Sequence, residues 1–332
     1  MKISSKFWQN HKLDYLFLTS EINRFWYTNF HSSQGLIIIS PKTKKAVAFL
    51  DERYADEAKQ KINNCEIKPL KEFINYWKSL KGNIGCEENL SWTIVNKLKK
   101  TNSQIKFKNI NIQTLRMIKE PYEIAQIKQI CQITAKVWEE MQKQIQPNWL
   151  ETEVEDLIRS EFRKHKVYEL AFNSIVSSGL HSHFIHTIAK PIQIQNHLLC
   201  DFGGKWKNYC SDFTRVMIFD DKSEINKMWK LVKKLQKKVI KMIRPGIKIS
   251  TLAKMANKFY LEHKIVQKHS LGHGVGLEVH ELPNINSFSE IILKPGMVFT
   301  IEPGIYLPKI GGVRIEDIVL VTENGHEVLT EC

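Results

Sequence analysis

The sequence lacks the features that identify secreted, membrane-spanning and disulfide-stabilised proteins. Its 332 residues include six cysteines but no Cys-x-x-Cys pair, which favours reduced thiols over a disulfide framework. The apolar stretches, such as residues 36–40, are far shorter than the roughly 20 residues that a membrane helix needs. The first residues also lack the apolar core and the cleavage site of a signal peptide. These absences predict a soluble, cytoplasmic protein without a membrane partner.

Acidic residues are outnumbered, and the formal net charge is +14, from 49 Lys and Arg against 35 Asp and Glu. The positive charge is carried mostly by lysine, is spread along the whole chain and forms no long block. No fingerprint of a nucleic-acid-binding module accompanies it. A lysine-rich genome composition explains the charge at least as well as a binding function does, so we predict no nucleic-acid partner.

The first third of the chain alternates segments typical of strands and of helices. Strands are expected at residues 16–18, 35–40, 45–50, near 84 and at 105–110, and helices at 52–62, 70–80 and 92–98. No cluster of His, Asp and Glu at ligand spacing occurs there, so a structural, oligomeric or substrate-gating role is expected. We predict an N-terminal α/β domain at residues 1–115 and a catalytic domain at residues 116–332.

The second part of the chain opens on helical segments. Helices are expected at residues 121–144, from 152 onward, at 224–242 and at 251–263. Thr152 and Glu155 have the spacing of a capping box, and Ser250 is suited to cap the last helix. Near the end of the chain, Asn324-Gly325 predicts a hairpin turn.

Two aspartates lie on what the pattern predicts to be adjacent strands. Asp201 ends an apolar run and is followed by two glycines within three residues, and Asp212 comes eleven positions later. Both carboxylates can therefore point into one pocket, and the glycines let the backbone pass close to a bound group. Cys200 is expected on the opposite face of its strand, whereas Cys210 shares the face of Asp212 and is a candidate neighbour.

Three further side chains have similar surroundings. His273 lies among three glycines, Glu302 is followed by Pro-Gly, and Glu316 opens another predicted strand. Each carboxylate alone is explained better as a solvated residue of a loop or of a strand end. Four carboxylates gathered without a cation would repel one another severely, and together with an imidazole they suit Mn²⁺, Co²⁺ or Zn²⁺. Two such ions can share a water and lower its pKa.

These segments resemble the metallopeptidase family with the pita-bread fold, which includes methionine aminopeptidases, Xaa-Pro aminopeptidases and Xaa-Pro dipeptidases. The family's ligand order is Asp, Asp, His, Glu, Glu, as in Asp201, Asp212, His273, Glu302 and Glu316. Residues 300–306 and 312–317 are similar to its proline-specific branch, as are residues 27–35 and 51–54 of the first part.

The resemblance implies an α+β fold, with a C-terminal pita-bread metallopeptidase domain after a smaller α/β, creatinase-like N-terminal domain. It further implies two divalent metal ions, Mn²⁺ ahead of Co²⁺ or Zn²⁺, and a homodimer. His186 and His280 match the histidines that steady the oxyanion. Glu302 would also move the proton, and Arg314 would orient a ligand carboxylate or a substrate carboxylate.

The match is incomplete near His186. Ile185 stands where a proline is common, and His181 and His183 crowd the same loop, where we expect exposed histidines. For the remaining histidines, His263, His269 and His326 among them, the sequence suggests no function.

The function that follows from the resemblance is hydrolysis of the bond between an N-terminal residue and proline. The substrates are then peptides with proline at the second position, and the enzyme is an Xaa-Pro aminopeptidase. An Xaa-Pro dipeptidase (prolidase) is the first alternative, because it differs only in requiring a free carboxylate on the proline. A catalytically inactive binding module of the same fold is the second. Methionine aminopeptidase fits less well, since that enzyme does not need the first domain.

Overall fold

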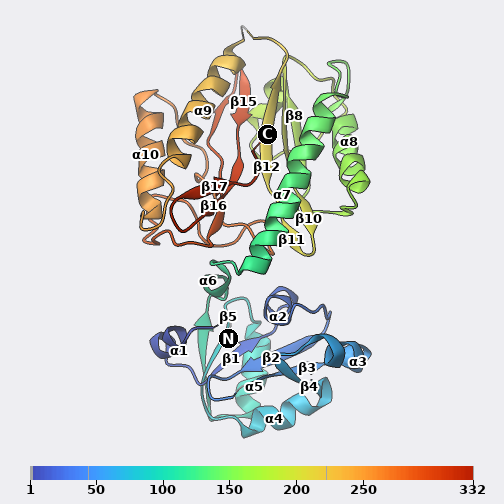
Figure 1. Ribbon diagram of the computed structural model, residues 1–332, viewed down its shortest axis with the longest axis vertical. Helices are drawn as coiled ribbons and strands as arrows, with labels where there is room; N and C mark the ends of the chain where they lie inside the picture. The colour runs from blue at the N-terminus through green and yellow to red at the C-terminus, as the bar shows by residue number, and fades with distance from the viewer. Residues whose placement is uncertain (1–2, 44, 222, 332) are drawn as a thin grey trace. The chain divides into compact units, whose positions relative to one another are not determined.

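The computed structural model describes residues 3–43, 45–221 and 223–331. The chain divides into two compact units, Met1–Arg116 and Met117–Cys332 (Figure 1). Within the described ranges, no helix is both long enough and apolar enough to cross a membrane. The five cysteines in these ranges are all free and buried.

The first unit is built on a mixed six-stranded sheet with the order β4-β3-β2-β1-β5-β6. Its strands are β1 (Tyr15–Leu18), β2 (Gly35–Ile39), β3 (Ala46–Leu50), β4 (Cys65–Pro69), β5 (Gly82–Glu87) and β6 (Ile105–Ile110). Its helices are α1 (Ser5–His11), α2 (Glu21–Thr28), α3 (Glu52–Lys61), α4 (Phe73–Ser79), α5 (Trp92–Thr101) and α6 (Gln113–Arg116), with a 3₁₀ turn at Leu70–Glu72. Strands β1, β2 and β3 pair antiparallel, and β4, β5 and β6 join in parallel.

Aromatic residues fill the core of this sheet. Phe17 and Phe49 come from strands, Phe73 and Trp77 from α4, and all four are buried in one cluster. The strands and helices expected here are confirmed, whereas β4 and the helices α1, α2 and α6 were not predicted.

The second unit places four short sheets between two pairs of helices. The helices are α7 (Pro121–Gln142), α8 (Glu151–Lys164), α9 (Glu224–Ile240) and α10 (Ile249–Glu262). The strands are β7 (Glu169–Leu170), β8 (Ile175–Ser178), β9 (His197–Phe202), β10 (Gly204–Trp206), β11 (Tyr209–Cys210), β12 (Phe213–Ile218), β13 (Val298–Ile301), β14 (Gly304–Leu307), β15 (Gly311–Arg314), β16 (Asp317–Val321) and β17 (His326–Val328). The sheet orders are β11-β10-β7, β12-β9-β8, β13-β16-β17 and β14-β15.

Two apolar clusters hold these layers together. Helices α9 and α10 cover one side of the strands, and α7 and α8 cover the other (Figure 1). On α9, Val232, Leu235 and Val239 are fully buried at helical spacing, while the intervening lysines remain outside. The strands between the helices are thus packed on both faces. This packing holds the strand ends, and the side chains that they carry, in fixed positions.

Two helix starts differ from the sequence prediction. Helix α8 begins at Glu151, one residue earlier, and the carboxylate of Glu153 accepts the backbone N–H of Leu150 at 2.6 Å. Thr152 and Glu155 therefore do not form a capping box. Helix α10 begins at Ile249 with Lys248, not Ser250, at its N-cap. The hairpin at Asn324-Gly325 is confirmed, since Thr322 N–H donates to the Gly325 carbonyl at 3.1 Å between β16 and β17.

Candidate active site

The antiparallel pair β9–β12 brings the two aspartates together. Asp201 lies opposite Thr214 in the register, and Asp212 immediately precedes β12. Oxygens of both aspartates and of Glu316 lie within 4.8 Å of one another. Cys200 belongs to the apolar cluster under α7 and α8, as its strand position predicts. Cys210 contacts the carbonyl of Leu277 through Sγ at 3.6 Å and is not part of this group.

The two glutamates come from the other side of the unit. Glu302 directly follows β13, and Glu316 stands between β15 and β16. A bridge of Glu316 with Thr214 joins the two sides, because Glu316 N–H donates to the Thr214 carbonyl at 3.1 Å. The Thr214 hydroxyl in turn donates to Glu316 Oε2 at 2.7 Å. The carboxylate of Glu316 is thereby held toward the aspartates.

The backbone before His273 packs so closely against β13 that a side chain on the preceding residue would not fit. A Cβ on Gly272 would lie 2.0 Å from the Thr300 carbonyl oxygen, so only glycine permits this approach. The His273 N–H donates to Thr300 Oγ1 at 3.1 Å. Its Nε2 lies 3.4 Å from Glu302 Oε1 and 3.5 Å from Asp212 Oδ2. The imidazole therefore faces both carboxylates.

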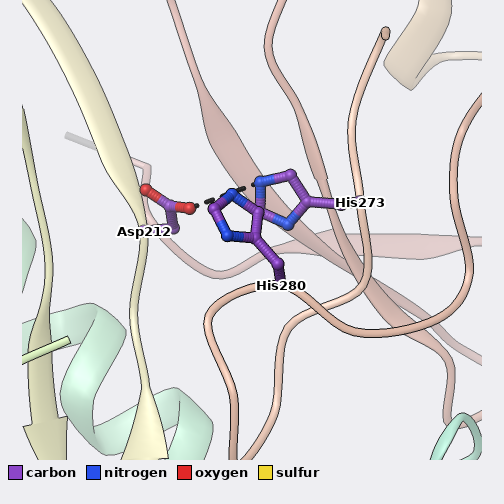
Figure 2. A group of neighbouring side chains, drawn as sticks. All are labelled: Asp212, His273 and His280. Atoms are coloured by element: carbon purple, nitrogen blue, oxygen red, sulfur yellow. Dashed lines mark ion pairs between the residues drawn. The ribbon is translucent and has the colours of Figure 1, made fainter. Parts of the chain in front are cut away.

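Figure 2 shows Asp212, His273 and His280 turned toward one another. The rings of His273 and His280 are 4.2 Å apart between centroids and are tilted edge to face. His280 is exposed, whereas His273 is buried. Both line the same cavity of about 280 Å³, together with His186 and the four predicted carboxylate residues. The cavity also has an apolar portion, made by Phe172, Ile175 and Ile185.

Arg314 is fixed by three separate contacts. Its Nε donates to Thr214 Oγ1 at 3.1 Å and its Nη1 to the Tyr306 hydroxyl at 2.7 Å. Its Nη2 pairs with Asp201 Oδ2. The side chain is 3% exposed. All three nitrogens of the guanidinium are thus engaged inside the protein, which fits an orienting role toward Asp201 better than a clamp on a substrate.

Burial and mutual repulsion disturb the pKa values of these groups strongly. Burial raises the pKa of Asp212 well above its usual range, and the neighbouring Glu316 and Asp201 raise it further. The pKa of Glu316 is raised in the same way, by burial and by Glu302. Burial also raises the pKa of Glu302 to about 8 and lowers the pKa of His273 to about 4. The positive charges of the protein therefore do not balance the negative charge of the buried carboxylates.

The donor set fits divalent cations. Asp201 Oδ1 is buried and has no hydrogen-bond partner among the described residues, which is costly unless a cation binds it. The lowered pKa of His273 keeps its imidazole neutral, the form that ligates metals. Carboxylate oxygens with one nitrogen suit ions such as Mn²⁺, Co²⁺ and Zn²⁺. Asp201, Asp212, His273, Glu302 and Glu316 are thus suited to hold such ions.

The sequence prediction missed His269 and misjudged His181. His269 lines the cavity, with Nε2 3.0 Å from the Tyr306 hydroxyl and Nδ1 3.6 Å from Glu302 Oε2. Its spacing of four residues before His273 was the available signal. His181 was expected to be exposed, but it is buried and contacts Glu151. His263 and His326 bond to backbone carbonyls away from the cavity.

Comparison with known proteins agrees with this geometry. The chain matches the model of Metallopeptidase family M24 over residues 125–323 and that of the Creatinase/Prolidase N-terminal domain over residues 5–118. It is 33% identical to an Xaa-Pro dipeptidase of Pyrococcus furiosus, across 98% of this chain and 96% of the relative. Among solved structures, an Xaa-Pro dipeptidase from Bacillus anthracis aligns with a TM-score of 0.91 at 31% identity, covering 98% and 95% of the two chains. An X-Pro aminopeptidase from Thermotoga maritima aligns with a TM-score of 0.87 at 30% identity, covering 98% and 97%.

Proposed function

The chain belongs to Metallopeptidase family M24 and is a metal-dependent hydrolase, and we propose that it is an Xaa-Pro dipeptidase. The support is the full-length similarity to proteins of that name. The sequence alone favoured an Xaa-Pro aminopeptidase, and these relatives favour its first alternative instead. The substrates would be dipeptides with proline at the second position. Because the amide nitrogen of proline carries no hydrogen, this bond requires a dedicated pocket.

Asp201, Asp212, His273, Glu302 and Glu316 would hold two divalent ions, Mn²⁺ ahead of Co²⁺ or Zn²⁺. When bound, the ions polarise the scissile carbonyl and lower the pKa of the attacking water. Glu302 takes the proton of that water and delivers it to the leaving nitrogen of proline.

The histidines that line the cavity stabilise charge on the substrate. His186 and His280 would donate hydrogen bonds to the carbonyl oxygen as it becomes negative. Arg314 would hold Asp201 in one orientation, as the hydroxyl of Thr214 holds Glu316. The apolar wall of Phe172, Ile175 and Ile185 offers a surface for the proline ring or the first side chain.

We also propose that residues 1–115 form a domain that assembles or gates the enzyme, and that the catalytic domain spans residues 116–332. The support for this division is the family model matched by each part. A homodimer is proposed from the family resemblance, and light scattering of the purified protein would test it.

One comparison of substrates tests the proposed activity. An Xaa-Pro dipeptide, the matching Xaa-Pro-Yaa tripeptide and an Xaa-Ala dipeptide are each incubated with Mn²⁺-loaded protein. Cleavage of the Xaa-Pro dipeptide alone supports the proposal. Equal cleavage of the tripeptide would make the protein an aminopeptidase. Absence of any cleavage by protein that contains its metal would contradict both and support an inactive module.

A specific observation keeps the aminopeptidase as the second candidate. Among the described residues that line the cavity, Arg314 is the one arginine or lysine, and its nitrogens are engaged with Asp201, Tyr306 and Thr214. A dipeptidase must bind the carboxylate on proline. The residues that line this cavity offer imidazoles for that purpose and no free guanidinium. The tripeptide in the comparison above decides between the two.

A further inference from the structure

The loop that carries His186 is closed at both ends by one buried carboxylate. Glu151, the first residue of α8, has no exposed surface. Its Oε1 accepts the backbone N–H of Ser178 at 2.7 Å, and its Oε2 accepts that of Lys190 at 3.0 Å. Glu151 does not cap its own helix, because Glu153 fulfils that role at Leu150. The carboxylate of Glu151 therefore holds the two ends of the loop, residues 178 and 190, by hydrogen bonds.

Inside the loop, His181 connects this carboxylate to the residue beside His186. Its Nδ1 lies 2.8 Å from Glu151 Oε2, and its Nε2 lies 2.7 Å from Thr187 Oγ1. A carboxylate can only accept, so Nδ1 carries a hydrogen, and Nε2 meets the Thr187 hydroxyl, which can donate or accept. The hydrogen bonds run unbroken from Glu151 through His181 to Thr187.

Apolar packing restrains only part of this loop, since Ala189 packs against the cluster under α7 and α8 and Ile185 lines the cavity. Phe184 is 58% exposed and Ile188 is 74% exposed, although they flank the loop's centre. A second polar anchor lies at Ser182, whose Oγ accepts the Gly312 N–H at 2.7 Å. Since Phe184 and Ile188 are exposed, polar contacts are the main restraint on the centre of the loop.

We propose that Glu151, His181 and Thr187 form a brace that positions His186 over the reacting carbonyl. This inference rests on the proposed function, in which His186 touches the substrate and the three brace residues act through it. A hydrogen-bond donor must be held within about 0.5 Å of its productive place to stabilise a transition state. The brace supplies that restraint on a loop whose large apolar side chains, Phe184 and Ile188, are exposed.

The test compares Thr187→Val, which removes the hydroxyl, with Thr187→Ser, which keeps it. We expect Thr187→Val to lower kcat on an Xaa-Pro dipeptide by about 10-fold or more, because a misplaced catalytic group costs up to about 100-fold. KM and bound metal should stay close to the parent values, and Thr187→Ser should restore kcat. Equal kcat in the parent and in both variants would overturn the brace.

Glu151→Gln provides a second variant, with Glu155→Gln as its matched control on the same helix. Glu155 forms an ion pair with Arg159 and has no hydrogen bond or ion pair with residues 178–190, all of which the structure describes. Glu151→Gln should lower kcat more than Thr187→Val does, whereas Glu155→Gln should leave it unchanged. If Glu151→Gln fails to fold, the two Thr187 variants still decide the matter.

A measurement without substrate separates the brace from the proposed activity. In metal-free protein, the imidazole NMR signal of His186 is identified by its loss in His186→Ala. It should be a single sharp signal in the parent and in Thr187→Ser, and should broaden or split in Thr187→Val. If the parent hydrolyses no Xaa-Pro peptide, the proposed function fails while this signal still tests the brace. An unchanged signal in Thr187→Val would contradict it.

Discussion

Arg314 and Asp201 form an ion pair that is almost closed to solvent, with side chains 3% and 10% exposed. Asp201 Oδ2 faces the guanidinium, and Oδ1 has no partner among the described residues. Arg314 therefore orients the carboxylate through Oδ2, and Oδ1 is left to bind a cation.

We expect Arg314→Lys to lower kcat/KM on Xaa-Pro dipeptides and to lower the content of bound metal. An ammonium cannot hold Asp201, Tyr306 and Thr214 together as the planar guanidinium does. Losses of this kind behind a metal ligand are typically about 10-fold to 100-fold. The measurements are kcat and KM on an Xaa-Pro dipeptide together with metal content. A raised KM with unchanged metal content would instead assign Arg314 to the substrate carboxylate.

His186→Ala and His280→Ala should each lower kcat by roughly 100-fold, the usual effect of removing one oxyanion donor. Metal content, measured by mass spectrometry, should remain that of the parent, because neither imidazole is among the five proposed ligands. His263→Ala is the control, since that imidazole bonds to the Phe259 carbonyl away from the cavity. Loss of metal from His186→Ala would identify His186 as a ligand.

Removal of metal by a chelator should abolish hydrolysis and lower the thermal unfolding midpoint. The carboxylates of Asp201, Asp212 and Glu316 then repel one another in a buried site. Mn²⁺ should restore both activity and midpoint, with two ions bound per chain. Full activity after complete chelation would exclude the proposed metal centre.

His197 makes the stability of the fold depend on pH. It is fully buried, with Nε2 2.8 Å from Ser182 Oγ, and burial lowers its pKa to about 4. The unfolded chain takes up the proton near pH 6.5, so this stability is present above pH 6.5 and is lost as the pH falls toward 4. Between pH 7 and pH 5 the parent should lose about 2 kcal/mol more than His197→Gln in urea unfolding. Identical pH profiles would show that His197 is not the group responsible.

A buried ion pair supports the loop of His280. Lys119 Nζ lies 2.7 Å from Glu281 Oε1, both side chains are 2% exposed, and Glu281 exchanges backbone hydrogen bonds with Gly274. Lys119→Met should destabilise the protein by about 3–5 kcal/mol, because it removes the cation facing a buried carboxylate. Lys128→Met, which breaks the exposed pair with Glu327, should cost about 1 kcal/mol or less. Urea unfolding of both variants makes the comparison, and equal losses would contradict it.

Local sequence indicated candidate ligands at the ends of predicted strands, although no single carboxylate was decisive by itself. Asp201 and Glu302 could be singled out because apolar runs stop there and a glycine follows two positions later. The sequence did not predict contacts between distant segments. His269 meets Tyr306 across 37 positions, and His181 meets Glu151 across 30, and neither pairing leaves a periodic pattern. The start of α8 shifted for a similar reason, since the N–H of Glu151 bonds to the Ile192 carbonyl.

The bridge between Thr214 and Glu316 also bears on ion selection. It ties the β9–β12 pair to the segment that enters β16 through main-chain atoms, so the two sides of the donor set cannot drift apart independently. The backbone around this donor set therefore needs little rearrangement when cations bind. Discrimination among ions then depends on ionic radius and preferred coordination number, measured against a spacing that the backbone has already set.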